Sequence, residues 1–227
     1  MRIGGLQKCS LIDYPGKISA IVFTVGCNFR CPYCHNPELV DETSEEISED
    51  EIFEFLGRRK NLLDAVTITG GEPTMHDDLI SFIRKIKALG FLVKLDTNGT
   101  NPDIIETVQN ENLVDYIAMD IKAPVNSYEK TVGRPVNADA IRKSIALIMN
   151  GTTPYEFRTT VVKTLLSPED VRAIGEDING ARTYYLQKFV PTKTLNPAFI
   201  RKTTYTDAEF EEMRTMVGTY VSTCTIR

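Results

Sequence analysis

Hydrophobic residues follow two alternating patterns along the chain, short β-branched runs and longer segments with a helical period. The short apolar runs are bounded by glycine or other turn residues and predict strands at 18–25, 65–69, 91–96, 113–120, 155–162 and 183–190. The longer segments place apolar residues three or four apart behind capping residues such as Ser48 with Glu51. They predict helices at 48–60, 78–89, 101–111 and 138–149, one opening at 167, and one at 206–220.

This alternation predicts an α/β fold, because strands that alternate with helices run parallel and are joined by right-handed crossovers. Eight such units need about 250 residues, and the chain has six units in 227 residues. We therefore predict a partial (β/α)6 barrel, with a flat doubly wound sheet as the second choice. No linker or repeat divides the sequence, so we expect one domain over 1–227, with a core at about 5–190. The remainder, 191–227, is expected to be a tail with one helix.

The overall charge and hydropathy exclude two classes of partner. The formal net charge is −5 and no basic stripe is present, which argues against a nucleic-acid partner. No apolar run approaches the roughly 18 residues of a membrane span, and the N-terminus lacks the apolar stretch of a signal peptide. We expect a cytoplasmic protein without a membrane partner.

Polar, charged and glycine residues directly follow four of the predicted strands. Because ligands of parallel α/β folds bind where the strands end, these residues are candidates for one site. They form the runs Gly26-Cys27-Asn28-Phe29-Arg30-Cys31-Pro32-Tyr33-Cys34-His35-Asn36, Thr69-Gly70-Gly71-Glu72-Pro73, Asp96-Thr97-Asn98-Gly99 and Asp120-Ile121-Lys122.

Three of the five cysteines lie within eight positions, spaced C-x3-C-x2-C at Cys27, Cys31 and Cys34. Iron–sulfur clusters are usually held by four cysteines, so three would leave one iron open to a further ligand. Two alternatives remain open from the residues alone. One is a structural zinc ion with His35 as a fourth ligand, and the other is a redox pair of Cys31 and Cys34.

The other strand ends carry weaker signals. Glycines at 70 and 71 would let the backbone approach a ligand and Glu72 would offer it a carboxylate, although a simple turn explains the same residues. Asp96 and Asp120 would repel one another and need a counter-charge, from Lys122 or from a bound monovalent cation.

Together these motifs resemble the radical SAM superfamily. The cysteine spacing with Tyr33 before the last cysteine is similar to that superfamily's signature, and Gly70-Gly71-Glu72 to its GGE motif. The runs 34–36, 96–99 and 120–122 resemble those of glycyl-radical-enzyme activases. The run 11–17, Leu-Ile-Asp-Tyr-Pro-Gly-Lys, looks closest to the activating proteins of anaerobic ribonucleoside-triphosphate reductase.

The resemblance implies one [4Fe-4S] cluster on Cys27, Cys31 and Cys34, with the amino and carboxylate groups of S-adenosylmethionine on the fourth iron. It places further residues around the cofactor: Tyr33, His35, Gly70, Gly71, Glu72, Asp96, Thr97, Asn98, Asp120 and Lys122, with Arg158 and Gln187 nearby and a monovalent cation near the two aspartates.

The implied reaction is reductive cleavage of S-adenosylmethionine to a 5′-deoxyadenosyl radical that takes hydrogen from a glycine of a partner enzyme, anaerobic ribonucleotide reductase. The alternative is a radical SAM enzyme acting on a small molecule or nucleoside. Only Cys9 and Cys224 lie outside the motif, so we expect no second cluster and an external electron donor, flavodoxin or ferredoxin.

Overall fold

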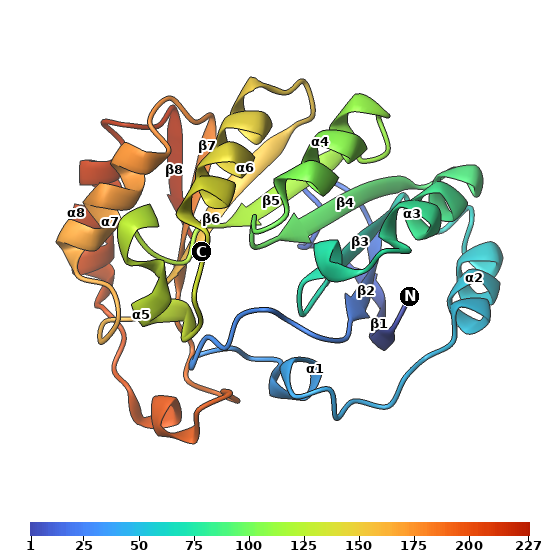
Figure 1. The fold of residues 1–227 in the computed structure, drawn as a ribbon, viewed down its shortest axis with the longest axis horizontal. Helices are drawn as coiled ribbons and strands as arrows, with labels where there is room; N and C mark the ends of the chain where they lie inside the picture. The colour runs from blue at the N-terminus through green and yellow to red at the C-terminus, as the bar shows by residue number, and fades with distance from the viewer.

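The computed structural model describes residues 1–227 as one eight-stranded sheet whose strands lie in chain order, β1 to β8 (Figure 1). The strands are β1 (Ile3–Ser10), β2 (Ser19–Thr24), β3 (Ala65–Gly70), β4 (Leu92–Thr97), β5 (Tyr116–Asp120), β6 (Tyr155–Val161), β7 (Thr183–Lys188) and β8 (Thr223–Ile226). Strand β1 pairs antiparallel with β2, and every other neighbouring pair is parallel. A curved, mostly parallel sheet confirms the partial barrel rather than the flat alternative.

The six predicted strands correspond to β2–β7, and the structure adds β1 and β8, which the sequence did not predict. Strand β1 reads IGGLQKCS, in which glycines and exposed polar residues hide any apolar run. Strand β8 has only four residues, half of them exposed. It pairs with β7, so residues 191–227 contribute a strand to the sheet as well as the predicted helix.

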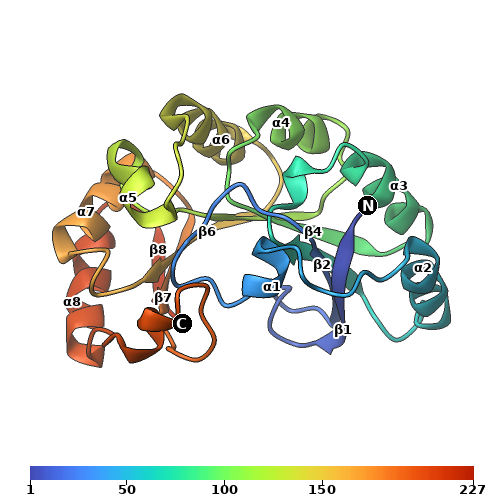
Figure 2. The same ribbon diagram turned by 60° about the horizontal axis from the view of Figure 1, so that its bottom comes forward.

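The long helices lie in an arc along the outer face of the sheet, as Figure 2 shows. They are α2 (Glu49–Arg58), α3 (Leu79–Ala88), α4 (Pro102–Asn110), α6 (Ala138–Asn150), α7 (Pro168–Asp177) and α8 (Asp207–Val217). Shorter helices, which the sequence did not predict, are α1 (Pro37–Val40), α5 (Tyr128–Val132) and the 3-10 turns η1 (Pro73–Met75), η2 (Val125–Ser127) and η3 (Pro197–Arg201). None of the helices combines the length and the apolar character needed to cross a membrane.

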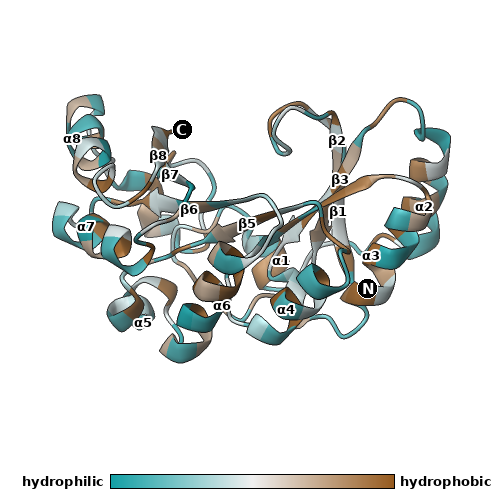
Figure 3. Cartoon of the chain, turned by 90° about the horizontal axis from the view of Figure 1, so that it is seen from above, coloured by the Kyte–Doolittle hydropathy of each residue, from teal (hydrophilic) through white to brown (hydrophobic).

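A cluster of 51 buried residues, from Ile3 to Val221, forms the core. In Figure 3 brown is concentrated in strands such as β3 and β5, whereas the helices carry much of the teal. The polar exceptions follow the alternation of the strands. In β4, Val93 and Leu95 belong to the core, and the intervening Lys94 and Asp96 are buried on the opposite face of the sheet. That inner face carries charged groups toward the ends of the strands.

Candidate functional site

A cavity of about 220 Å³ lies where the parallel strands end, and the predicted site residues other than Arg158 and Gln187 all line it. Its lining includes Cys27, Cys31, Tyr33, Cys34, His35, Gly70, Gly71, Glu72, Asp96, Thr97, Asn98, Asp120 and Lys122. These residues follow or end β2, β3, β4 and β5, which are neighbours in the sheet. The expectation that these runs share one rim is confirmed.

The loop that carries the three cysteines, residues 26–36, is held between two distant segments. On one side the Arg30 N–H donates to the carbonyl of Val132, at the end of α5 (2.8 Å). On the other side lies a segment that we call the strap, residues 190–202. Its Leu195 and Asn196 N–H groups donate to the carbonyls of Cys34 and Pro32, each at 2.9 Å. These backbone bonds fix the cysteine loop.

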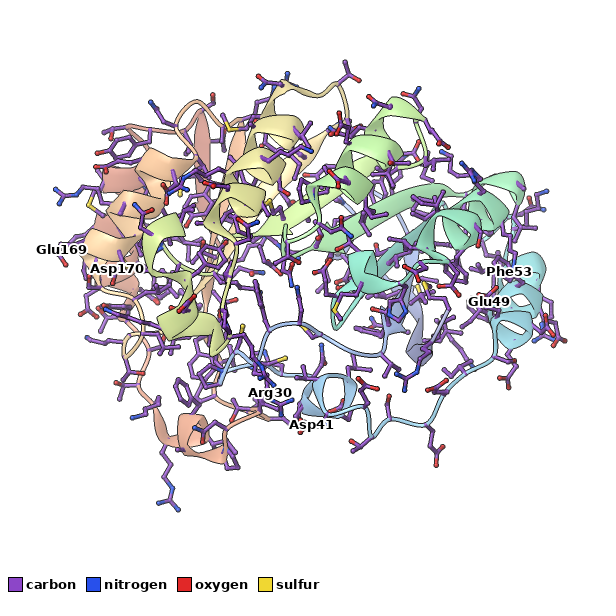
Figure 4. All side chains as sticks on the ribbon, viewed as in Figure 1. Arg30, Asp41, Glu49, Phe53, Glu169 and Asp170 are labelled. Atoms are coloured by element: carbon purple, nitrogen blue, oxygen red, sulfur yellow. The ribbon has the colours of Figure 1, made fainter.

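An ion pair between Arg30 and Asp41 lies on the outer side of the cysteine loop (Figure 4). Both side chains are exposed, so solvent screens this pair and it adds little to stability. It nevertheless links the loop to the residue that follows α1. The cysteine loop is therefore braced along its outer side as well as at both flanks.

All three thiols are free and directed into a cavity that takes them out of water. Burial raises the pKa of Cys27 to about 12 and that of Cys31 to about 11, so both thiols keep their protons in the absence of metal. A bound iron would displace those protons, because thiolate is the form that ligates metals. The buried Tyr33 hydroxyl also lines this cavity without a hydrogen-bond partner, which leaves a polar group for a ligand.

Three cysteines and His35 line the cavity. This donor set could serve either an iron–sulfur cluster on three thiolates or a zinc ion with the imidazole as its fourth ligand. His35, the fourth ligand in the zinc alternative, stacks on Phe189 and hydrogen-bonds the Val190 carbonyl through Nε2 (2.9 Å). The three cysteines therefore fit an iron–sulfur cluster.

The Gly70-Gly71-Glu72 turn fits tightly against the start of the cysteine loop. A Cβ atom on Gly71 would lie 1.8 Å from the Gly26 carbonyl oxygen, and one on Gly70 would lie 2.2 Å from the amide nitrogen of Thr24. From the sequence, these glycines were explained either by close approach of a ligand or by a simple turn. The structure shows that packing against protein backbone already requires them.

Glu72 is 1 % exposed and is already fully hydrogen-bonded. Its carboxylate accepts from the Thr74 N–H (3.1 Å) and hydroxyl (2.5 Å), the Thr97 hydroxyl (2.7 Å) and the Asn98 N–H (2.6 Å). Burial raises its pKa, and these four donors oppose that rise. Glu72 thus ties the end of β3 to the end of β4.

Three protein cations neutralise the two aspartates. Of these, only Lys122 was predicted from the sequence to be their counter-charge. Arg158, from β6, donates to Asp96 Oδ2 through both terminal nitrogens (3.1 Å each) and to Asp120 Oδ1 through Nε (2.9 Å). Lys122 lies 3.2 Å from Asp120 Oδ2, and Lys94 pairs with Asp96 Oδ1. Although burial raises the pKa of Asp120, Arg158 and Lys122 hold it well below its usual range.

Sequence reasoning missed several residues of the cavity and its surroundings. Asn28 and Asn98 bond through their amides (2.8 Å), and Asn28 also donates to Thr100 (2.8 Å), which joins the cysteine loop to β4. Thr160 lines the cavity, and its hydroxyl lies 3.4 Å from Gln187 Oε1. Lys94 could have been found from its position two residues before Asp96, since alternate residues of a strand share a face.

The sequence matches the family model of the radical SAM superfamily over residues 21–178. A protein of Methanocaldococcus jannaschii named "putative glycyl-radical enzyme activating enzyme" is 34% identical, over 99% of this chain and 95% of its own. The pyruvate formate-lyase-activating enzyme of Clostridium pasteurianum is 29% identical, over 86% of this chain and 83% of its own.

Solved structures share the fold at low sequence identity. SuiB of Streptococcus suis superposes with a TM-score of 0.66 at 15% identity, over 91% of this chain and 48% of its own. Coproporphyrinogen III oxidase of Escherichia coli superposes with a TM-score of 0.61 at 14% identity, over 88% of this chain and 52% of its own. The chain therefore spans about half of either protein.

Proposed function

The chain belongs to the radical SAM superfamily and, within it, to the glycyl-radical-enzyme activating enzymes, and on this premise we propose that its partner is an anaerobic ribonucleoside-triphosphate reductase. Activation of a glycyl radical enzyme follows from the family, which uses a [4Fe-4S] cluster and S-adenosylmethionine. The finer assignment of the partner is supported by the run 11–17 of the sequence.

One observation supports the assignment of the cofactor site: three free thiols share a cavity with the GGE turn and with a neutralised pair of aspartates. In the proposed assignment Cys27, Cys31 and Cys34 hold three irons of the cluster. The turn at 70–72 receives the ammonium group of the cofactor. Asp96, Thr97, Asn98, Asp120 and Lys122 receive its ribose and carboxylate, and Tyr33 and His35 lie toward the adenine.

The bound cluster and S-adenosylmethionine supply the radical chemistry when the cluster is reduced. The residues of the chain orient the cofactor and keep water from the site. Tyr33 is buried with its ring edge-on to that of Phe189, and the strap is bonded to the cysteine loop at Cys34 and Pro32. Such exclusion of water protects a reactive radical from side reactions.

The direct test uses anaerobically reconstituted protein, dithionite, S-adenosylmethionine and a candidate reductase. We expect stoichiometric 5′-deoxyadenosine and a glycyl radical signal by electron paramagnetic resonance. Cofactor cleavage without a glycyl radical on any candidate would instead favour the alternative, a small-molecule or nucleoside substrate. Zinc at one ion per chain, without iron or sulfide after reconstitution, would exclude both.

Three finer points stay predictions from the sequence: flavodoxin or ferredoxin as electron donor, a cytoplasmic location, and a monovalent cation near Asp96 and Asp120. Reduction by purified flavodoxin in place of dithionite tests the first. The cation would compete with the protein cations already bonded to these carboxylates, and the salt dependence of cofactor cleavage decides between them.

A further inference from the structure

We propose that Lys94 is a positioning residue of the cofactor site, which together with Arg158 and Lys122 neutralises the two aspartates and makes the enzyme independent of monovalent cations. The proposal rests on the proposed function, because it assigns Asp96 and Asp120 to the cofactor site. It goes further by naming the group that holds Asp96 and by excluding a metal cation from the same place.

All four carboxylate oxygens of the aspartate pair already have cationic partners. Asp96 Oδ1 pairs with Lys94 and Asp96 Oδ2 accepts from Arg158. Asp120 Oδ1 accepts from Arg158, and Asp120 Oδ2 lies 3.2 Å from Lys122. A metal cation bridging the carboxylates would have to share an oxygen with one of these cations, and the two like charges would repel. Each oxygen of the pair therefore already faces a protein cation that opposes metal binding.

Lys94 is the most deeply buried of these cations, with its side chain 1% exposed. A buried ammonium is costly unless it is paired, and Asp96 is the carboxylate paired with it. The two residues lie two positions apart in β4, so the backbone fixes their common face. Lys94 therefore holds Oδ1 of the Asp96 carboxylate, while Oδ2 of the same carboxylate accepts from Arg158.

The buried carboxylate of Glu156 also has protein cations near it and does not need a metal cation. Glu156 is 1% exposed and lies 3.9 Å from Arg158 and 3.2 Å from Arg227. Four cations, Lys94, Lys122, Arg158 and Arg227, therefore face the three carboxylates of Asp96, Asp120 and Glu156 and that of Glu72, which lines the same cavity as the two aspartates. The charges on this face balance, so no carboxylate is left for a metal cation to neutralise.

The first experiment compares sodium, potassium, ammonium and choline chlorides at constant ionic strength on the wild-type protein. We expect the apparent KM for S-adenosylmethionine and the rate of 5′-deoxyadenosine formation to agree among the four salts. The thermal unfolding midpoint of the metal-free protein is expected to agree as well. A wild-type enzyme that is active in potassium and inactive in choline would overturn the proposal.

The second experiment removes the ammonium in two ways. In Lys94→Ala the lost side chain leaves room for a small cation, whereas in Lys94→Met an apolar chain of similar length fills that room. We expect both variants to bind S-adenosylmethionine about tenfold or more weakly, the size of a lost hydrogen bond to a charged group. Ammonium is expected to restore Lys94→Ala at least in part and to leave Lys94→Met unchanged.

The same variants are measured without metal or cofactor, so that folding and activity are separated. Ammonium binding beside Asp96 should raise the unfolding midpoint of Lys94→Ala over its value in choline, because a ligand of the native state stabilises it. Lys87→Met is the matched control: it removes a lysine bonded to Asp115 outside the cavity (2.7 Å). We expect Lys87→Met to keep wild-type affinity for the cofactor.

The outcomes separate the two proposals. If the wild-type protein binds a cluster but cleaves no S-adenosylmethionine, the proposed function fails, and the unfolding midpoints still report on Lys94. If both Lys94 variants keep wild-type affinity, or if ammonium leaves Lys94→Ala unchanged in binding and in midpoint, the positioning role of Lys94 is wrong.

Discussion

At the scale of single residues, the GGE turn shows that the residues of a ligand-binding motif can also be required by packing and hydrogen bonding within the protein. Gly70 adopts a φ of +121°, and both glycines face backbone atoms at distances that no side chain could share. The Glu72 carboxylate accepts hydrogen bonds from Thr74, Thr97 and Asn98. The motif therefore sets the relative position of two strand ends and of the cysteine loop.

Gly71→Ala should displace the cysteine loop, because its Cβ would overlap the Gly26 carbonyl oxygen. We expect iron and sulfide content after reconstitution to fall well below the wild-type value, and stability to drop by about 2 kcal/mol or more in urea unfolding. Gly57→Ala is the control, since nothing lies within 4 Å of a Cβ at this helical position. It should gain up to about 1 kcal/mol. Full cluster loading of Gly71→Ala would contradict the argument.

At the scale of elements, the sequence predicted what hydrophobic periodicity controls and missed what long-range pairing controls. The runs behind β2–β7 are apolar enough to be recognised, and their order is confirmed by the sheet. Strands β1 and β8 owe their conformation to pairing with β2 and β7. The strap has no periodicity at all, because its contacts are backbone bonds to a loop about 160 residues earlier. The contact between the strap and the cysteine loop therefore could not be predicted from the sequence.

Leu195→Pro tests the strap, because proline lacks the N–H that bonds the Cys34 carbonyl (2.9 Å). We expect the reconstituted cluster of the variant to bleach faster in air than that of the wild type, as measured by the loss of visible absorbance. The far-ultraviolet circular dichroism of the variant should stay close to that of the wild type. Thr203→Pro places the same residue at an exposed position whose N–H forms no backbone bond. Equal bleaching rates for Leu195→Pro and wild type would show that the strap does not protect the cluster.

At the scale of the whole molecule, the parallel sheet itself assembles the site. The predicted residues are spread from Cys27 to Lys122, yet all line one cavity because their strands end at one rim. Lys94 had no comparable signal, and Arg158 was placed near the cofactor only by the family resemblance, because the importance of both depends on which carboxylates they meet in three dimensions. We propose that residues 1–227 act as one domain, since a single core cluster reaches from Ile3 to Val221.

A core of this size makes the fold independent of the cluster, and Cys31→Ala tests that consequence. Cys31 is 7% exposed and packs in the core cluster, so the lost sulfur should cost about 1 kcal/mol through a small void. We expect native circular dichroism and a slightly lower urea midpoint, with iron and sulfide at background. Cys224→Ala removes a half-buried thiol from β8, outside the cavity, and should keep full iron content. Global unfolding of Cys31→Ala, with Cys224→Ala intact, would mean that the cysteine loop supports the fold as well as the cofactor.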